Sequence, residues 1–180
     1  GVMVVHCSGA TEVDALAHAA AAGASIGGFH PMQTFGDPAA AVDTLPGSTI
    51  TIEAEGELFT TLQDLATALS CRVNRLPPGM RGRYHAAAGY TSQFINALFD
   101  QALTIWRSWG ARDEDALQAL LPLAHGTLVS IRSAGVAKGM PGPVSRGDLK
   151  SIAKHLDAIG EMNPEALAFY KTLCAATVPI

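Results

Sequence analysis

The sequence predicts a partial α/β sheet followed by an all-α helical region, and three observations support this fold class. Before residue 77, short β-branched runs alternate with stretches of helical composition, which is typical of an α/β layer with largely parallel strands. The segment LPPGMRGR contains two consecutive prolines and a glycine, which interrupt helices and strands. It predicts a boundary between a domain at 1–78 and a domain at 79–180. The residues after this boundary have helical composition and periodicity.

Four short strands are expected in the first domain. Residues 2–5, VMVV, form a continuous apolar run that is typical of a strand covered on both faces. The second strand is expected within ASIGGFHPM, the third over STITIEA and a brief fourth over CRVNRL. Helices are expected over 11–23, with Thr11 as N-cap and Gly23 as C-cap, and over GELFTTLQDLATALS.

The second domain is expected to contain long helices. Apolar residues repeat at seven-residue spacing over about 81–109, which predicts one unusually long helix ended by Gly110. RDEDALQALLPLAHGTLVSIRSAG predicts one or two further helices, with Pro122 opening the second. The last helix is expected to begin with Asn163 as N-cap and Pro164 at its first position.

The composition argues against several classes of protein. The net charge of −4 gives no basic surface for nucleic acid or an anionic membrane. No segment approaches the ~20 apolar residues that a membrane span needs. The three cysteines lie far apart, as expected of small buried side chains in a reducing cytoplasm. The six histidines show no metal-ligand spacing, so no metal site is expected.

The amino terminus is expected to be a truncation point. Gly1 is followed at once by an apolar strand. The sequence does not begin with a basic region followed by a hydrophobic run, which is the pattern of a signal peptide. We therefore expect a piece of a longer chain.

The stretch GPVSRGDLKSIAKHL places Arg146, Asp148 and His155 at the start and along one side of a predicted helix. Ser145 and Asp148 have the spacing of a capping box, which favours a purely structural role. Asp148 and His155 lie two turns apart, about 10 Å, which is too far for direct contact. By spacing alone, this stretch is a capped amphipathic helix, and a functional role stays open.

Two other histidines are candidates for chemistry. His85 lies in RYHAAAGY, among residues small enough for close approach of a ligand or another helix. A histidine there can act as general acid or base, or it can simply be satisfied in a helix-packing seam. His30 follows a predicted strand, at the edge where open α/β sheets bind ligands, and His6 with Ser8 and Gly9 shares that position.

Several motifs together resemble one group of oxidoreductases. They are VVHCSGA, GASIGGFHPMQTFGDP, RYHAAAGYTSQFINAL, LLPLAHGTL and GPVSRGD followed by HL. The group has a Rossmann dinucleotide-binding domain followed by a helical domain of unknown function. It is similar to ketopantoate reductases, pyrroline-carboxylate reductases and the 6-phosphogluconate dehydrogenase superfamily, and HPM also resembles prephenate dehydrogenases.

The resemblance implies a hydride transfer between NADP or NAD and a small carbonyl, imine or alcohol. The substrate would lie between the two domains, the helical domain would form a homodimer, and a deazaflavin cofactor stays open. The resemblance also implies site residues: catalytic His85, Arg146 and Asp148; cofactor-binding Ser8, Gly9, His30 and Pro31; and substrate-binding Gln93 and His155.

The chain departs from this group at several places. The first half of the Rossmann domain, with its G-x-G-x-x-G turn, is absent. Gln93 and Ser130 stand where asparagines are expected, and Pro141 stands where threonine is expected. A second hypothesis is therefore a non-catalytic helical module for dimerisation or binding.

Overall fold

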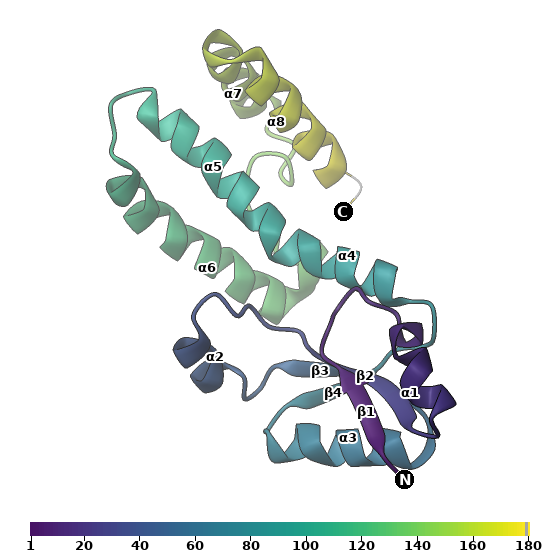
Figure 1. Ribbon diagram of the computed structural model, residues 1–180. Coiled ribbons are helices and arrows are strands. Elements are labelled where there is room, and N and C mark those ends of the chain that lie inside the picture. The colour runs from purple at the N-terminus through teal and green to yellow at the C-terminus, as the bar shows by residue number, and fades with distance from the viewer. Residues whose placement is uncertain (179) are drawn as a thin grey trace. The chain divides into compact units, whose positions relative to one another are not determined.

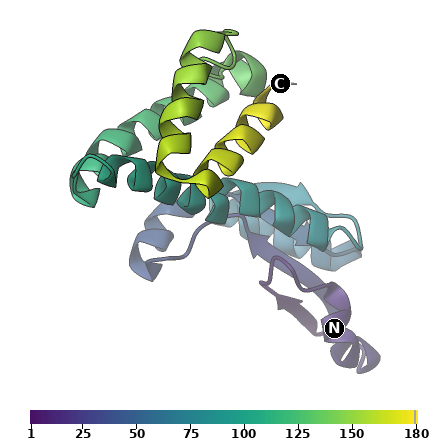
Figure 2. The same cartoon turned by 90° about the horizontal axis from the view of Figure 1, so that it is seen from above.

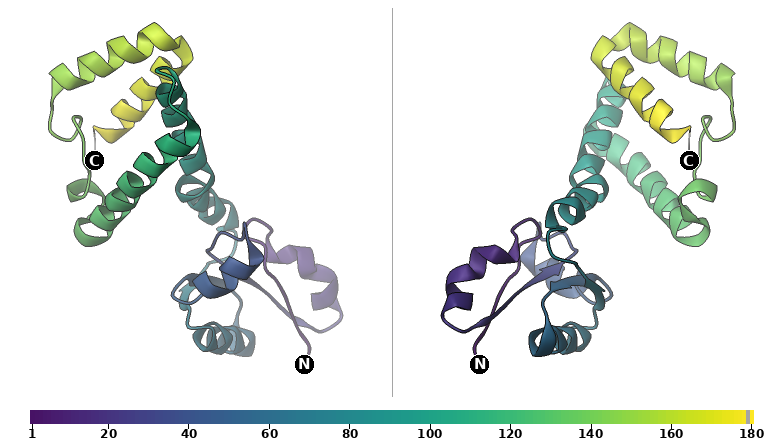
Figure 3. Two further views of the ribbon diagram at one scale, coloured as in Figure 1. Left: turned by 90° about the vertical axis from the view of Figure 1, so that its left-hand side faces the viewer. Right: turned by 90° about the vertical axis from the view of Figure 1, so that its right-hand side faces the viewer.

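The computed structural model describes residues 1–178 and 180 and divides the chain into two compact units, Gly1–Ile95 and Asn96–Ile180 (Figure 1). The first unit contains a four-stranded sheet with helices. The described residues of the second unit form helices and their connecting turns (Figure 2, Figure 3). In the first unit, the strands are β1 (Met3–His6), β2 (Ser25–Pro31), β3 (Thr49–Glu53) and β4 (Arg72–Arg75). Its helices are the 3₁₀ turn η1 (Val13–Leu16), α1 (Ala17–Ala21), α2 (Pro38–Thr44), α3 (Gly56–Ala68) and α4 (Arg81–Thr91).

All four predicted strands are present, but the sheet is mixed. The strand order is β1-β2-β3-β4, with β1 parallel to β2, β2 antiparallel to β3 and β3 parallel to β4. The prediction of largely parallel strands is wrong at the centre of the sheet. The short α2 buries only Ala41, so the chain between β2 and β3 turns back without placing a full helix across the sheet.

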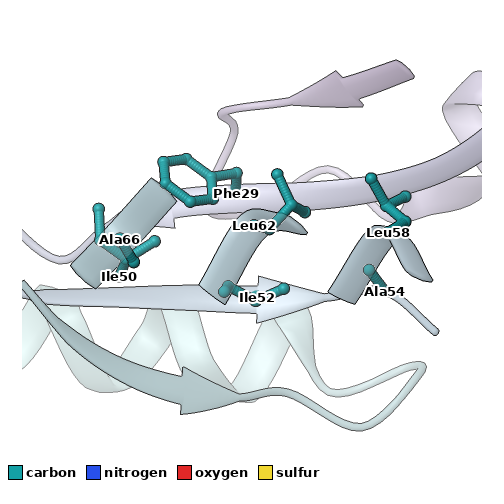
Figure 4. Packing of buried hydrophobic residues seen from close by; sticks show 7 residues of the cluster. All are labelled: Phe29, Ile50, Ile52, Ala54, Leu58, Leu62 and Ala66. Carbon is teal, nitrogen blue, oxygen red and sulfur yellow. The ribbon is translucent and has the colours of Figure 1, made fainter. Parts of the chain in front are cut away.

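One face of the sheet is the hydrophobic core of the first unit. Successive strand residues point to opposite faces, so Phe29 of β2 and Ile50 and Ile52 of β3 share a side. The helix α3 runs along this side and buries Leu58, Leu62 and Ala66 against them (Figure 4). Burial of aliphatic side chains at this interface stabilises the unit by roughly 1.5–3 kcal/mol for each large residue.

Two helices of the first unit differ from expectation. The predicted helix over 11–23 forms only as η1 and α1, and Thr11 caps neither of them. Gly23 does end the segment, with φ of 90°. The helix α2 was not predicted, although its start has a clear signal: Asp37 accepts a hydrogen bond from the Ala39 amide, and Pro38 occupies the first position.

The long helix predicted over about 81–109 is broken at Ser92, with φ −128° and ψ −87°. The Ser92 hydroxyl donates to the carbonyl of Ala88, and the hydroxyl of Thr91 does the same. Such bonds from serine and threonine compete with the helical backbone pattern. A new helix, α5 (Gln93–Arg107), follows the break, and Gly110 with φ of 84° comes after it as expected.

The remaining helices of the second unit are α6 (Asp113–Lys138), α7 (Leu149–Met162) and α8 (Pro164–Thr177). Pro122 lies inside α6 and opens no new helix, which corrects the prediction; the helix is instead interrupted at Gly135, with φ 80° and ψ 172°. Asn163 caps α8 as predicted, accepting from the Glu165 amide at 2.8 Å. The helices α7 and α8 pack against each other.

The core of the first unit predicts a strong contrast between two leucines of α3. Leu58 is 2% exposed and Leu65 is 47% exposed. Leu58→Ala removes apolar contacts and leaves a cavity, so it is expected to lower the free energy of unfolding by about 2–5 kcal/mol. Leu65→Ala is the matched control in the same helix and is expected to change it by less than about 1 kcal/mol. Urea unfolding measures both, and equal effects would contradict the assigned core.

Candidate functional site

The second face of the sheet is polar, and the strand register arranges its side chains in two rows. The first row consists of His6 on β1, Gly28 on β2 and Glu53 on β3, which are register partners. The second row consists of His30, Thr51 and Asn74 on β2, β3 and β4. The pleat places both rows on the face opposite Phe29 and Ile52.

Arg81, the first residue of α4, is fully buried over the first row. Its Nε donates to Glu53 Oε2 at 2.5 Å, and its Nη1 donates to the carbonyl oxygen of Ser8 at 2.7 Å. One guanidinium therefore joins the start of α4 to the end of β3 and to the turn after β1. Leaving one charge of such a buried pair without its partner costs roughly 3–5 kcal/mol.

Gly28 makes room for this guanidinium. A Cβ at position 28 would lie 1.7 Å from Arg81 Nη2, so only glycine fits beneath the buried charge. Among the described residues, Arg81 Nη2 and His6 Nε2 are the buried side-chain atoms without a hydrogen-bond partner. One nitrogen belongs to the first row, and the other belongs to the guanidinium that lies over it.

Two imidazole rings approach the turn that follows β1. A Cβ on Gly9 would lie 2.6 Å from His85 Cδ2 and 2.8 Å from His30 Nε2. The two ring centroids are 6.4 Å apart, and the ring planes make an angle of 69°. His30 is half-buried, whereas His85 is exposed. The absence of a side chain at Gly9 therefore allows two histidines from β2 and α4 to meet the same turn.

Tyr84 of α4 contacts His30 of the second row. Its hydroxyl lies 2.7 Å from His30 Nδ1, and the two rings meet edge to face. In the same row, the Thr51 hydroxyl accepts a hydrogen bond from Asn74 Nδ2 at 3.2 Å. A tyrosine of α4 thus holds the His30 ring.

Burial and neighbouring charge keep His6, His30 and Tyr84 in their neutral forms. Burial lowers the pKa of His30, and His85, Arg81 and His6 lower it further. Burial, followed by the charge of Arg81, also lowers the pKa of His6. Burial raises the pKa of Tyr84, although Thr51 and Arg81 oppose this effect. His6, His30 and Tyr84 are therefore neutral hydrogen-bonding groups at neutral pH.

In the second unit, Asp148 is the N-cap of α7. Its carboxylate accepts from the Ser151 amide at 3.0 Å and from the Ser151 hydroxyl at 2.6 Å. These hydrogen bonds, with the charges of Arg146 and His155, lower the pKa of Asp148. The expected capping box of Ser145 with Asp148 is wrong, because Ser145 donates to the carbonyl of Gly142. A carboxylate of the chain itself thus occupies the amino end of α7.

The other residues on this side are more open. Arg146 is exposed, and His155 Nδ1 lies 2.8 Å from the hydroxyl of Tyr170 on α8. Leu98, Ile105, Phe169 and Tyr170 belong to the lining of an apolar pocket of about 200 Å³ within the second unit.

The structure brings together only part of the candidate set that the sequence predicted. Ser8, Gly9, His30 and His85 gather at one turn of the first unit. Pro31 ends β2 as the register partner of Ile50, on the core-facing set of positions. The side chain of Gln93 lies against Gly89 of α4. Arg146, Asp148 and His155 belong to the second unit.

Sequence reasoning missed four residues on the polar face of the sheet or directly over it: Thr51, Glu53, Arg81 and Tyr84. A signal for two of them exists, because Thr51 and Glu53 alternate with isoleucines in TITIE and so predict one polar strand face. Nothing local indicates that Arg81 lies over that face, since 28 residues separate it from Glu53.

Two further properties concern the described part of the chain as a whole. Within residues 1–178 and 180, no group of three metal-ligating side chains lies close enough to hold an ion. None of the helices in that part is both sufficiently long and sufficiently apolar to cross a membrane.

The close approach at Gly28 predicts a severe effect of one methyl group. In Gly28→Ala the new Cβ collides with the buried Arg81 guanidinium, so we expect a loss of roughly 3 kcal/mol or more in the free energy of unfolding. Gly82→Ala, one residue beyond Arg81 in α4, meets no atom within 4 Å. It is expected to stabilise by about 0.5–1 kcal/mol, as alanine does in helices. Thermal and urea unfolding of both variants decide the matter.

The lowered pKa values of His6 and His30 predict a dependence of stability on pH. The unfolded chain holds protons on these rings up to about pH 6.5, whereas the folded chain releases them at lower pH. The free energy of unfolding is therefore largest above about pH 6.5, and it decreases as the pH falls toward the pKa values of the two rings in the folded chain. NMR titration of the two rings and urea unfolding from about pH 7.5 to 5.5 measure this. Ring titration above 6.5 would contradict it.

Solved structures with the same fold cover nearly the whole chain. Protein TM1727 from Thermotoga maritima is 20% identical, with a TM-score of 0.80 over 98% of this chain and 69% of its own. The "putative NADP oxidoreductase BF3122" from Bacteroides fragilis is 24% identical, with a TM-score of 0.75 over 99% of this chain and 65% of its own. A reductive aminase from Aspergillus terreus, solved with NADPH and ethyl levulinate, is 16% identical, with a TM-score of 0.62 over 98% of this chain and 64% of its own.

At these identities the likeness shows a shared fold. The chain spans about two thirds of the length of each of these three structures. No curated protein matches the sequence. Residues 48–177, from the start of β3 through α8, match the family described as "Domain of unknown function (DUF2520)". The chain therefore belongs to the DUF2520 family.

Proposed function

We propose that the chain is part of an NADP-dependent oxidoreductase that transfers hydride between the nicotinamide and a small carbonyl, imine or alcohol. NAD and a deazaflavin are the alternative cofactors. One observation supports this proposal most strongly: two histidines converge on the Ser8–Gly9 turn at the carboxyl end of β1. In open α/β sheets this edge is where ligands bind. The same fold occurs in a reductive aminase solved with NADPH.

The residues at this edge suit a neutral nicotinamide ring. Gly9 lets the His30 and His85 rings approach the turn, and His30 Nε2 takes part in no hydrogen bond with the described residues. Ser8, Gly9 and His30 would hold the cofactor there, whereas Pro31 lies on the core-facing side of β2. When bound, the cofactor supplies the hydride. The protein's own residues bind and orient the reactants.

His85 is the residue we assign to proton transfer. It is exposed, borders the same turn as His30 and lies on α4, whose start is fixed by the buried Arg81. A general acid or base must lie within hydrogen-bond reach of the proton that it transfers. His85 would donate a proton to a carbonyl or imine as it is reduced, or accept one from an alcohol as it is oxidised.

Arg146, His155 and Gln93 are the residues that we assign to the substrate. Arg146 is exposed and can bind an anionic group through its guanidinium. Asp148 would fix the entry to α7, since its carboxylate already caps that helix. His155 and Gln93 would contact the rest of the substrate.

Calorimetric titration with NADPH and NADH tests the cofactor assignment. We expect the chain to bind NADPH with a dissociation constant on the order of micromolar. Gly9→Ala pushes both imidazole rings off the turn and is expected to weaken binding at least tenfold. Gly36→Ala, in the loop after β2, meets no atom within 4 Å and is the control that should leave binding unchanged.

Turnover tests the role of His85. Oxidation of NADPH is followed with a panel of small ketones, aldehydes and imines. His85→Ala should keep the NADPH affinity and lower the rate by about 10²–10⁴-fold, as loss of a general acid does. Failure of the unaltered chain to bind NADPH at millimolar concentration would refute cofactor binding by this chain.

A second candidate function is a non-catalytic module that forms a homodimer. One observation favours it: α6 leaves Leu121, Leu128 and Val129 at least half exposed, and they share one side of that helix. Such exposed apolar surface is typical of an interaction site. Analytical ultracentrifugation separates the possibilities, because a dimer disrupted by Leu128→Glu without loss of NADPH binding would assign the two functions to different surfaces.

A further inference from the structure

The main-chain groups of Ser8 are held from two sides by side chains that other contacts keep in place. The Ser8 amide donates to His6 Nδ1 at 3.2 Å, and the Ser8 carbonyl oxygen accepts from Arg81 Nη1 at 2.7 Å. His6 is the last residue of β1, and its pairing with Gly28 fixes it in the sheet. Arg81 is fully buried and bound to Glu53. The turn after β1 is therefore held at one residue by β1 and by α4.

Two further hydrogen bonds complete this turn. The Ser8 hydroxyl donates to Thr11 Oγ1 at 2.8 Å and accepts from the Thr11 amide at 3.1 Å. The next residue, Gly9, is buried and is the point that the His30 and His85 rings approach. A displacement of Ser8 would therefore move the position at which these two histidines converge.

The hydrogen bond from Ser8 also assigns the proton of the His6 ring. A backbone amide can only donate, so His6 Nδ1 is the acceptor and carries no proton. The neutral ring then has its proton on Nε2. An imidazolium has a proton on both nitrogens and cannot accept from the Ser8 amide. The turn in this structure therefore requires the neutral form of His6.

The charges around His6 also disfavour its protonated form. Arg81 Nη2 lies over Gly28, the register partner of His6 on a strand about 4.8 Å away. Glu53 is the carboxylate of this row, and it already binds Arg81. A protonated His6 would place a second cation beside the guanidinium, with one carboxylate for both. Burial lowers the pKa of His6 and Arg81 lowers it further, whereas Glu53 and the backbone of Glu12 oppose these effects.

We infer that His6 is the positioning residue of the Ser8–Gly9 turn and that its protonation releases the turn at acidic pH. With a proton on Nδ1, the Ser8 amide loses its acceptor, and Arg81 alone holds that residue from the side of the sheet. The effect on a ligand rests on the proposed function, because a released turn weakens NADPH binding only if the cofactor lies there. The response of the turn itself to pH does not depend on the cofactor.

NMR of the wild-type chain from about pH 7.5 to about pH 5 tests the response of the turn. Long-range ¹H–¹⁵N spectra should show that neutral His6 is protonated on Nε2. The Ser8 amide proton should move upfield as the pH falls, with the same midpoint as the His6 ring. His30 on β2 interacts electrostatically with His6, so its ring is followed in the same spectra. A Ser8 amide that stays in place, or that follows the midpoint of His30, would overturn the inference.

Two variants of His6 separate its hydrogen bond from its charge. In His6→Asn the side-chain oxygen takes the place of Nδ1 and accepts from the Ser8 amide at every pH, so that amide should cease to titrate. His6→Phe keeps a ring without an acceptor, so its Ser8 amide should have the released resonance at neutral pH as well. His18→Asn is the matched control, because His18 is exposed on α1. Its Ser8 amide should titrate as in the wild-type chain.

Calorimetric titration with NADPH then connects the turn to the ligand. Wild type and His6→Asn should bind NADPH equally at about pH 7.5. One pH unit below the His6 midpoint, the wild-type chain should bind up to about tenfold more weakly than His6→Asn, since only about one ring in eleven is then neutral. Comparison at the same pH removes any contribution from titration of NADPH itself.

The results distinguish the role of His6 from the proposed function. A neutral His6 protonated on Nδ1, or a Ser8 amide that titrates in His6→Asn as in the wild type, would overturn the role of His6. Equal NADPH affinities of both chains at every pH would refute the effect on the ligand and leave the proposed function standing. If neither chain binds NADPH, the proposed function fails, and the titration of the Ser8 amide alone decides whether His6 positions the turn.

Discussion

The buried ion pair between Arg81 and Glu53 determines how the polar side of the first unit is built. Arg81 begins α4 and Glu53 ends β3, so the pair fixes where the helix starts relative to the sheet. The same guanidinium donates to the Ser8 carbonyl, which holds the turn after β1 to both. Tyr84 and His85 follow within the first turn and a half of α4, and their positions therefore depend on this anchor.

A pair of this kind contributes less to stability than to arrangement. Removing two charges from water costs several kcal/mol, and their attraction offsets that cost only when the geometry is good and other hydrogen bonds are made. Arg81 satisfies Nε and Nη1 but leaves Nη2 without a partner. An apolar residue would fill the space at least as favourably. What the ion pair supplies, and an apolar contact does not, is a unique position for α4.

The sheet divides these tasks between its faces. On the side of α3, packing of aliphatic residues provides cohesion and tolerates no polar group. On the other side, Gly28 and Gly9 remove side chains where a guanidinium and two imidazoles must approach the backbone. Both glycines have ordinary backbone conformations, so their lack of a Cβ is what matters there.

Features of this fold that depend on neighbouring residues could be predicted from the sequence, whereas features that depend on contacts between distant residues could not. Strands were predictable from β-branched runs, and Asn163 from its cap signal, because both depend on neighbouring residues. The antiparallel pairing of β2 with β3 depends on the path of the chain between them, and the break at Ser92 on hydroxyl groups that no periodicity reveals. The sequence indicated each candidate histidine separately. Their proximity at Gly9 depends on the strand order and on the bond from Arg81 to Ser8, which are 73 residues apart.

The two histidines at this turn have environments suited to different tasks. His30 is half-buried, hydrogen-bonded to Tyr84 and surrounded by groups that lower its pKa, so it stays neutral and keeps one orientation. His85 is exposed, so its ring is in contact with solvent. The proposed hydride transfer calls for one group that holds the acceptor still and another that delivers a proton. A turn bordered by one hydrogen-bonded and one exposed imidazole offers a separate residue for each of these tasks.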